Sequence, residues 1–242
     1  HDQDSIYLVP EALRDAGIDR EVLTMLDLHD RGDQRHEDRE RERWRGFVSR
    51  IGQADRDCTI AVTGKYTALR DAYASIIKAC EHVSVHSGVN VNLRWLDTPN
   101  VDASNVASRL RDVHGVIVPG GFGIRGTEGK IDCIRFCREN NVPFLGICLG
   151  FQMAVIEFAR NVVGIKDANS TEFDQKCADP VIDILPEQKM IEGLGGNMRL
   201  GGKDVEIRPG TLASRLFDGA SSVRLRFRHR YEVDPRYIAR LQ

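Results

Sequence analysis

Short apolar runs alternate with helix-like periods from Asp57 onward. Continuous apolar runs at Cys58–Val62, Gly115–Val118 and Pro143–Ile147 are typical of strands that are buried on both faces of a sheet. The segments between them predict an alternating strand nearer an edge, at Val89–Leu96, and helices at Asp71–Cys80, Ala103–Val113 and Thr127–Asn140. Another helix follows the last strand and extends to Arg160. This order predicts an α/β fold with an open, doubly wound, mostly parallel sheet and helices on both faces.

The first 56 residues follow a different pattern. Apolar positions between Ser5 and Leu28 predict a short extended piece and one or two amphipathic helices, too small to fold alone. From His29 to Arg43 almost every residue is polar, which predicts a solvated connector or the polar start of a helix whose buried face begins at Trp44. We therefore predict three parts: a tail at 1–28, a charged linker and helix at 29–56, and the α/β domain at 57–242.

Composition narrows the classes of function. The chain has 242 residues, of which 41% are hydrophobic and 29% charged, with a formal net charge of -2, so it can bury a core. This balance provides no basic field for nucleic acid, and no apolar run approaches the roughly 20 residues that cross a bilayer. The six cysteines lack the paired spacing of zinc sites. We expect a cytoplasmic protein with reduced thiols and no metal site, acting on small molecules without nucleic-acid or membrane partners.

One cysteine lies where a strand turns sharply into a helix. The segment Gly146–Gly150, GICLG, is the thiol version of the G-x-S-x-G nucleophile elbow. Its flanking glycines allow the tight turn, and the helix N-terminus after Cys148 favours thiolate over thiol. The backbone N–H of Leu149 then points to where an oxyanion would form. Cys148 therefore predicts acyl transfer through a thioester.

A glycine-rich loop follows the preceding strand. Pro119–Gly123, PGGFG, should lie beside the elbow, because both leave the same edge of the sheet. Gly121 or Phe122 could supply a second oxyanion donor. The loop lacks the lysine and hydroxyl of a Walker motif, which argues against a phosphate site of that type.

These residues resemble a class I glutamine amidotransferase, and more narrowly the glutaminase part of the CTP synthase family. The segments that carry the resemblance span nearly the whole chain: SIYLVP (5–10), VTGKYTALRDAY (62–73), VPGGFGIRGTEGK (118–130), PFLGICLGFQ (143–152), NSTEF (169–173), GGNMRLG (195–201) and RHRYEVDP (228–235). The resemblance implies that 1–28 is the C-terminal tail of an amidoligase domain. It also implies hydrolysis of L-glutamine through a cysteine thioester, with the ammonia used in ATP-dependent amination of UTP to CTP, a ligase reaction of pyrimidine biosynthesis.

The resemblance further implies roles for individual residues. Cys148 would be the nucleophile, and Gly121 and Leu149 would form the oxyanion hole. An acidic and a basic anchor suit a substrate that carries an ammonium and a carboxylate on one carbon. Phe122 is implied as a stacking surface for GTP, the allosteric activator. The residues implied to bind glutamine are Gly121, Leu149, Gly150, Phe151, Gln152, Glu172 and Arg230.

The resemblance leaves two parts of the family's machinery outside the sequence. ATP and Mg²⁺ are implied for the amidoligase domain, which is also implied to assemble the full-length enzyme as a homotetramer. The triad of the family is completed by a His-Pro-Glu motif, which does not occur in these 242 residues. His229, between two arginines, is expected to be a surface residue. We therefore expect the α/β domain to be incomplete at its C-terminus and the chain alone to be inactive.

Three alternatives remain open. Another class I glutaminase, such as that of GMP or carbamoyl phosphate synthesis, would share the elbow but not the first and last of these segments. A noncatalytic regulatory module would retain the fold without a competent triad, and the absence of the triad histidine and glutamate from these residues is the feature that favours it. A cysteine hydrolase acting on some other amide would have no use for Glu172 and Arg230 as anchors.

Overall fold

The computed structural model describes residues 3, 5–28, 31–65, 67, 69–184, 188 and 198–242. The chain forms two compact units, one of His1–Cys58 with Asp71–Asn92 and the other of Thr59–Arg70 with Leu93–Gln242. The second unit contains the elbow and the glycine-rich loop. No helix among the described residues is long and apolar enough to span a membrane.

The first unit is helical where the sequence predicted helices, and its first element differs from the prediction. Its elements are a 3-10 helix Ile6–Leu8, α1 Val9–Asp15, α2 Ile18–Met25, α3 Gln34–Val48 and α4 Ala74–Ser87. The predicted extended piece is the 3-10 helix, which begins after Ser5, because the Ser5 hydroxyl accepts a hydrogen bond from the Tyr7 amide. Asp33 caps α3 in the same way, so the polar stretch is helical from Gln34 onward.

Aromatic side chains hold part of this helical unit together. The indole of Trp44 donates to the Tyr7 carbonyl at 3.1 Å, and the Tyr7 ring meets the Phe47 ring edge-on at 5.5 Å between centroids. The Tyr7 hydroxyl and His82 Nε2 are 2.7 Å apart. No residue of α3 is buried, but its half-buried apolar positions begin at Trp44, where the sequence predicted the buried face to begin.

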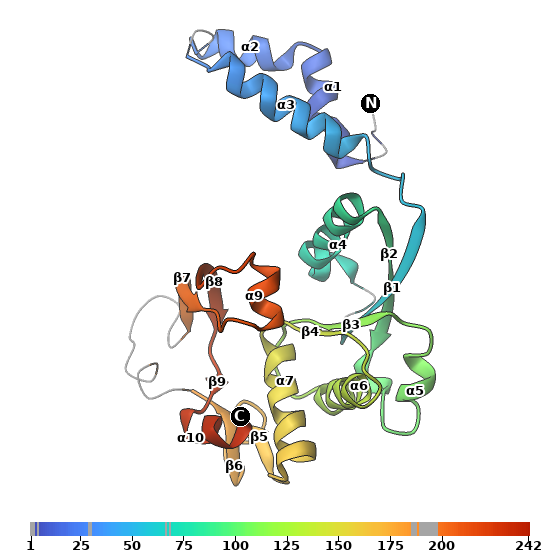
Figure 1. The fold of residues 1–242 in the computed structure, drawn as a ribbon, viewed down its shortest axis with the longest axis vertical. Coiled ribbons are helices and arrows are strands. Elements are labelled where there is room, and N and C mark those ends of the chain that lie inside the picture. The colour runs from blue at the N-terminus through green and yellow to red at the C-terminus, as the bar shows by residue number, and fades with distance from the viewer. Residues whose placement is uncertain are drawn as a thin grey trace. The chain divides into compact units, whose positions relative to one another are not determined.

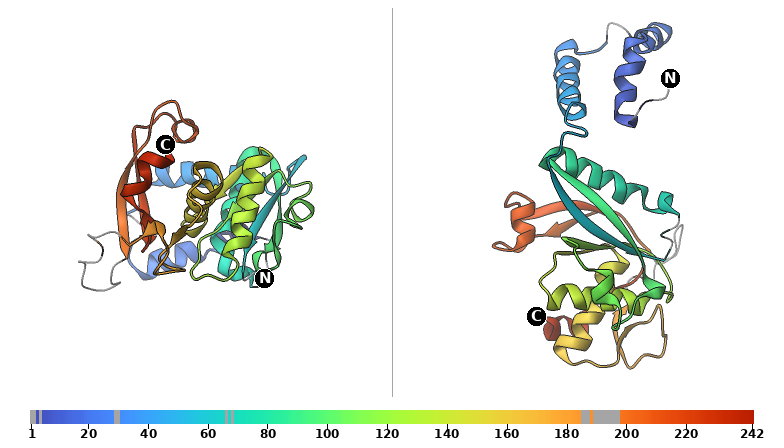
Figure 2. Two further views of the ribbon diagram at one scale, coloured as in Figure 1. Left: turned by 90° about the horizontal axis from the view of Figure 1, so that it is seen from below. Right: turned by 90° about the vertical axis from the view of Figure 1, so that its right-hand side faces the viewer.

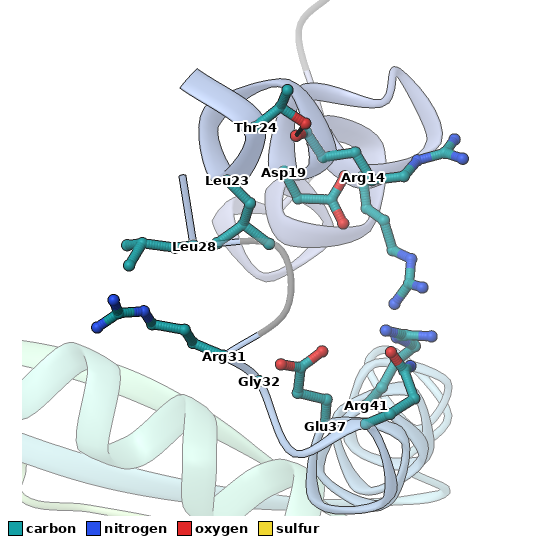
Figure 3. A pocket seen from close by; sticks show the side chains of 11 residues that line it. Arg14, Asp19, Leu23, Thr24, Leu28, Arg31, Gly32, Glu37 and Arg41 are labelled. Carbon is teal, nitrogen blue, oxygen red and sulfur yellow. Dashed lines mark hydrogen bonds between the residues drawn. The ribbon is translucent and has the colours of Figure 1, made fainter. Parts of the chain in front are cut away.

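The first unit also contains a cavity of about 840 Å³ between α1–α2 and the start of α3. Figure 3 shows side chains of the two helical segments across it, Asp19 on one side and Glu37 on the other. Its lining is dominated by charge, with the arginines Arg14, Arg20, Arg31 and Arg41. Its lining contains no cysteine, so the size of a cavity does not identify the site of the Cys148 thiol.

The second unit is built on a four-stranded sheet with the order β2-β1-β3-β4 (Figure 1). The strands are β1 Arg56–Gly64, β2 Val89–Asp97, β3 Gly115–Val118 and β4 Phe144–Gly146. β1 pairs with β3 and β3 with β4, both in parallel, and Val118 stands opposite Gly146. The chain thus winds outward from β1 in both directions, which confirms the predicted fold class and brings the loop after β3 next to the elbow after β4.

Besides α4, which connects β1 to β2, the helices that connect or follow these strands are α5 Val106–Arg109, α6 Thr127–Glu139 and α7 Leu149–Phe158, with a π-helical turn continuing to Val163. The predicted helix Ala103–Val113 was wrong in length. Asp112 adopts a left-handed φ of 62°, so the helix does not continue through it. The Asp102 carboxylate accepts from the amides of Ser104 and Asn105, as that of Asp33 does at the start of α3, but here the α-helix begins only at Val106.

The α/β core lies between the sheet and α6 and α7. Met153 and Ile156 of α7 are fully buried in the same cluster as Val116 and Val118 of β3. Burying such side chains stabilises by roughly 1.5–3 kcal/mol each. The core therefore fixes α7 against β3, and with it the position of its first residue.

The remaining chain adds strands after α7. β5 Ala168–Ser170, β6 Asp179–Asp183 and β9 Glu232–Val233 form one sheet, and β7 Arg199–Glu206 pairs with β8 Ser222–His229 as an antiparallel hairpin (Figure 2). Short helices α9 Leu212–Leu216 and α10 Pro235–Leu241 complete the unit. Part of the GGNMRLG segment, residues 195–197, lies outside the described residues.

Candidate active site

The elbow at Cys148 has the strained backbone that such turns require. Cys148 has a φ of 53° and a ψ of -107°, and α7 begins at the next residue. A Cβ on Gly150 would lie 1.9 Å from the Val118 carbonyl oxygen, and one on Gly146 would lie 2.7 Å from the Gly150 carbonyl carbon. A non-glycine residue in this conformation costs about 1–3 kcal/mol and persists only when its surroundings hold it. The elbow predicted from GICLG is confirmed.

The sulfur of Cys148 is half-buried at the wall of a cavity of about 700 Å³, which Gln152 and residues of β8 and β9 also line. Burial raises the pKa of this thiol, the Leu149 amide lowers it through a hydrogen bond, and the negative charge of Glu172 raises it. The Leu149 amide at the helix N-terminus favours the thiolate, as expected, but burial outweighs it and the net shift of the pKa is upward.

The glycine-rich loop lies beside the elbow, as the sequence predicted. A Cβ on Gly120 would lie 3.4 Å from the Cys148 Cβ, and one on Gly121 would lie 3.6 Å from Leu149 Cδ2. Phe122 is 65% exposed. The loop thus lies beside Cys148 and Leu149 and exposes one aromatic ring to solvent.

The two predicted anchors, Glu172 and Arg230, lie near one aromatic residue. Burial raises the pKa of Tyr231; the charge of Glu172 raises it further and that of Arg230 lowers it. Both charges are therefore close enough to act on this hydroxyl. Sequence reasoning missed Tyr231, although it follows Arg230 within RHRYEVDP. The Glu172 carboxylate is not free, since its Oε1 accepts from the Gly123 amide at 2.7 Å.

Two glutamine side chains hold the bend at Arg230 and Tyr231. Gln152, only 6% exposed, donates to the Tyr231 carbonyl at 2.7 Å, and Gln188 donates to the Arg230 carbonyl at 3.0 Å. The Gln152 side-chain amide is thus engaged with the protein. Its backbone amide is also engaged, since it donates to the Cys148 carbonyl at 3.1 Å.

His229 is not the surface residue that the sequence suggested. Its Nε2 is 3.1 Å from Glu232 Oε1, its side chain is 17% exposed, and both residues line the cavity with Cys148. The Glu232 carboxylate is also 2.6 Å from Arg199 Nε. His229 is half-buried because alternate residues near the end of β8 turn inward.

Two lysines lie close to the glycine-rich loop, and sequence reasoning assigned a role to neither. Lys65 donates to the Phe122 carbonyl. Lys130 is only 3% exposed, and its Nζ lies 3.9 Å from where a Cβ on Gly121 would be. Burial lowers the pKa of Lys130 to about 8, as does repulsion from Lys65, whereas Glu172 raises it. In the sequence, the one feature that singled out these lysines was that they lie within VTGKY and GTEGK, parts of two segments that carry the family resemblance.

The buried ammonium of Lys130 predicts a pH-dependent effect on stability. Because its folded pKa is lowered from 10.5 to about 8, the folded state binds fewer protons than the unfolded state between these values. The destabilisation of the folded state by the buried Lys130 ammonium is complete below pH 8 and is relieved as the pH rises toward 10.5. Lys130→Met should therefore raise the free energy of unfolding at pH 7 by roughly 3 kcal/mol, and the gain should shrink toward pH 10. Urea unfolding at both pH values measures this; an equal difference at both would contradict it.

Comparisons with known proteins agree with this geometry. The family model "Glutamine amidotransferase class-I" matches residues 68–241. A CTP synthase of Archaeoglobus fulgidus is 47% identical over 241 residues, which cover 100% of this chain and 43% of that protein. A CTP synthase of Methanopyrus kandleri is 46% identical over 244 residues, covering 100% and 44%. The chain thus spans less than half the length of these curated relatives.

A solved structure is similar over most of the chain. It is the glutaminase domain of Trypanosoma brucei CTPS with bound acivicin, which has a TM-score of 0.71 and 36% sequence identity. The match covers 76% of this chain and 71% of that one.

Proposed function

Because the chain belongs to the class I glutamine amidotransferase family, we propose that it is the glutaminase part of a CTP synthase. It would release ammonia from L-glutamine for the ATP-dependent amination of UTP to CTP. The observation that carries this proposal is the left-handed elbow at Cys148, with the Leu149 amide on its sulfur and the glycine-rich loop alongside. The similarity to CTP synthases over the whole chain favours this family over other class I glutaminases.

The proposed reaction is acyl transfer in two steps. The Cys148 thiol gives its proton to a base, and the sulfur forms a bond to the side-chain carboxamide carbon of glutamine. The carbonyl oxygen becomes an oxyanion, for which the amides of Leu149 and Gly121 are the proposed donors. The carbon–nitrogen bond then breaks, and the nitrogen takes the proton and leaves as ammonia. Water hydrolyses the thioester to glutamate and restores the thiol.

The proposed substrate site uses charges of opposite sign. Arg230 would hold the α-carboxylate through its planar fork, and Glu172 would accept from the α-ammonium through Oε2, since Oε1 is bonded to Gly123. The backbone of Leu149–Gln152, with Gly150 and Phe151, would complete the site along the first turn of α7. The shared influence of Glu172 and Arg230 on Tyr231 supports their closeness.

The activity that we propose for the chain by itself depends on which group takes the proton of the Cys148 thiol. The resemblance assigns this role to a histidine of a His-Pro-Glu motif, which the 242 residues do not contain. We propose that these residues alone hydrolyse glutamine roughly 10⁴-fold more slowly than an enzyme with a complete catalytic triad. His229 is held by Glu232, and the proposal assigns no step to it.

The first 28 residues support the proposal of a larger enzyme. Apolar side chains of this segment face outward, with Met25 78% exposed and Ile6 and Leu26 both 60% exposed. Such exposure is typical of a surface that packs against another domain. We propose that this segment is the tail of an amidoligase domain, which would form the homotetramer and bind UTP, ATP and Mg²⁺.

No residue of this chain is assigned to the nucleotides or the metal of that domain. Among the described residues, no group of three or more histidines, cysteines or acids is placed to hold a metal ion. GTP is proposed to stack on Phe122, which is supported by its exposed ring. A cytoplasmic location is part of the same proposal.

Acivicin labelling tests the proposed glutaminase site. The trypanosomal domain was solved with acivicin bound, so this compound is a suitable glutamine-like electrophile for the protein produced from its complete gene. We expect one adduct, on Cys148, and protection by L-glutamine. Cys177, which is also half-buried, is an internal control and should stay unmodified. Modification spread over Cys58, Cys80 and Cys177 without protection by glutamine would contradict the proposal.

A further inference from the structure

We propose that Lys65 and Glu172 are positioning residues that clamp one peptide group of the glycine-rich loop, and that this clamp links recognition of the substrate's ammonium to the oxyanion site. This inference rests on the proposed function. It adds a role for Lys65, and a second role for Glu172 besides binding the ammonium.

The clamp grips the peptide group between Phe122 and Gly123 at both ends. The Lys65 ammonium donates to the Phe122 carbonyl, and the Gly123 amide donates to Glu172 Oε1 at 2.7 Å. In a trans peptide the C=O and N–H point in opposite directions within one plane, so the two charged groups lie at opposite edges of the peptide group. Both bonds are charge-assisted and therefore roughly twice as strong as neutral ones.

The charges also exclude the reversed orientation. A flip of this peptide would turn its N–H toward the Lys65 ammonium and its C=O toward the Glu172 carboxylate. Each hydrogen bond would be replaced by a repulsion. Gly123 has a left-handed φ of 74°, a conformation that glycine adopts without steric cost. A glycine also allows the backbone to adopt other conformations at this position. The clamp thus fixes a loop whose own sequence would allow several conformations.

The residues of the clamp come from different strand ends. Lys65 follows β1 directly, and Glu172 lies two residues beyond β5. The buried Ser170 hydroxyl accepts from the Glu172 amide at 3.1 Å and fixes the backbone that carries the carboxylate. The loop itself follows β3, so the clamp connects three parts of the α/β unit beside Cys148.

Lys130 adds a second positive charge on the Gly121 side of the loop. Its Nζ lies 3.9 Å from where a Cβ on Gly121 would be, and the corresponding Lys65 distance at Gly123 is also 3.9 Å. Its charge interacts with both Lys65 and Glu172. The loop therefore lies among two ammonium groups and one carboxylate.

The arrangement links substrate binding to catalysis through Glu172. A carboxylate has two oxygens, and Oε1 is bonded to Gly123. An α-ammonium bound at Oε2 would fix the same carboxylate that orients the loop, and so the amide of Gly121 next to the sulfur. Loss of Lys65 would release one end of the peptide while leaving both substrate anchors in place. The expected result is a lower kcat with little change in KM.

The test uses the protein produced from its complete gene. We expect Lys65→Met to lower the glutamine-dependent kcat by about 10²-fold, the effect of losing one oxyanion donor, with KM for glutamine changed by less than about threefold. Lys65→Arg retains a donor and should recover most of the loss. Lys166→Met, at an exposed lysine of the same unit, is the matched control and should behave as wild type. CTP formation from added ammonia should be unchanged in all three, which shows that they fold.

A pair of Glu172 variants tests the other end of the clamp. Glu172→Gln keeps an acceptor for Gly123 and loses the charge, so it should mainly raise KM. Glu172→Met loses both the acceptor and the charge, and its kcat should be about 10²-fold lower than that of Glu172→Gln. Wild-type kcat in Lys65→Met, or equal kcat in the two Glu172 variants, would overturn the clamp. Failure of the proposed function is a different result, since wild type itself would then form no CTP from glutamine.

Discussion

Gly150→Ala is expected to disrupt the elbow and destabilise the α/β unit by about 3 kcal/mol or more, the upper end for overpacked sites. The new Cβ would lie 1.9 Å from the Val118 carbonyl oxygen and 2.7 Å from its carbon. That carbonyl is already fixed, because it accepts from the Ile147 amide at 2.9 Å. Neither β3 nor α7 can move aside without opening the core between them, so the strain cannot be relieved locally. The measurement is the urea midpoint of unfolding, together with glutaminase activity, which should be lost.

Gly121→Ala is the matched control for stability. A Cβ there would meet only Leu149 Cδ2 at 3.6 Å and Lys130 Nζ at 3.9 Å, which are ordinary contacts. The free energy of unfolding should change by less than about 1 kcal/mol. If Gly150→Ala unfolded at the same urea concentration as Gly121→Ala, the close packing of α7 on β3 would be refuted.

The elbow and the fold class could be predicted because their signals are local. A buried strand shows as an apolar run, and GICLG places small residues on both sides of one cysteine, so both features can be read within a few neighbouring positions. The structure confirmed them with a left-handed Cys148 and a parallel β1-β3-β4 arrangement.

Features that depend on distant residues could not be read in this way. The Lys65–Phe122 and Gly123–Glu172 contacts join segments that are far apart in the sequence. The same holds for the raised pKa of Cys148, since burial and the charge of Glu172 arise only in the folded chain. His229 was judged by its arginine neighbours in the sequence, whereas its partner in space is Glu232.

Some errors were local and came from turn chemistry. The helix expected at Ala103–Val113 is limited to Val106–Arg109, and Asp112, beyond its C-terminal end, is left-handed. Aspartate adopts this conformation more readily than most residues, so Asp112 could have shortened the predicted helix. The strands after residue 160 carried too weak a pattern to be predicted as a set.

Cys148→Ser is the second substitution with a very large expected effect. It removes the group that forms the thioester, while the oxygen is close enough in size to sulfur to leave the elbow and the core intact. Glutamine-dependent CTP formation should fall by at least about 10⁴-fold, as for loss of a nucleophile in a catalytic triad. CTP formation from added ammonia bypasses the glutaminase step and should stay within about twofold of wild type.

The ratio of these two rates in Cys148→Ser, measured in the protein produced from its complete gene, tests the central claim most directly. The account predicts that activity with glutamine is lost and that activity with ammonia is retained. Substantial activity with glutamine would show that another group attacks the substrate, and loss of both activities would show that Cys148 serves the fold; either result would contradict the account.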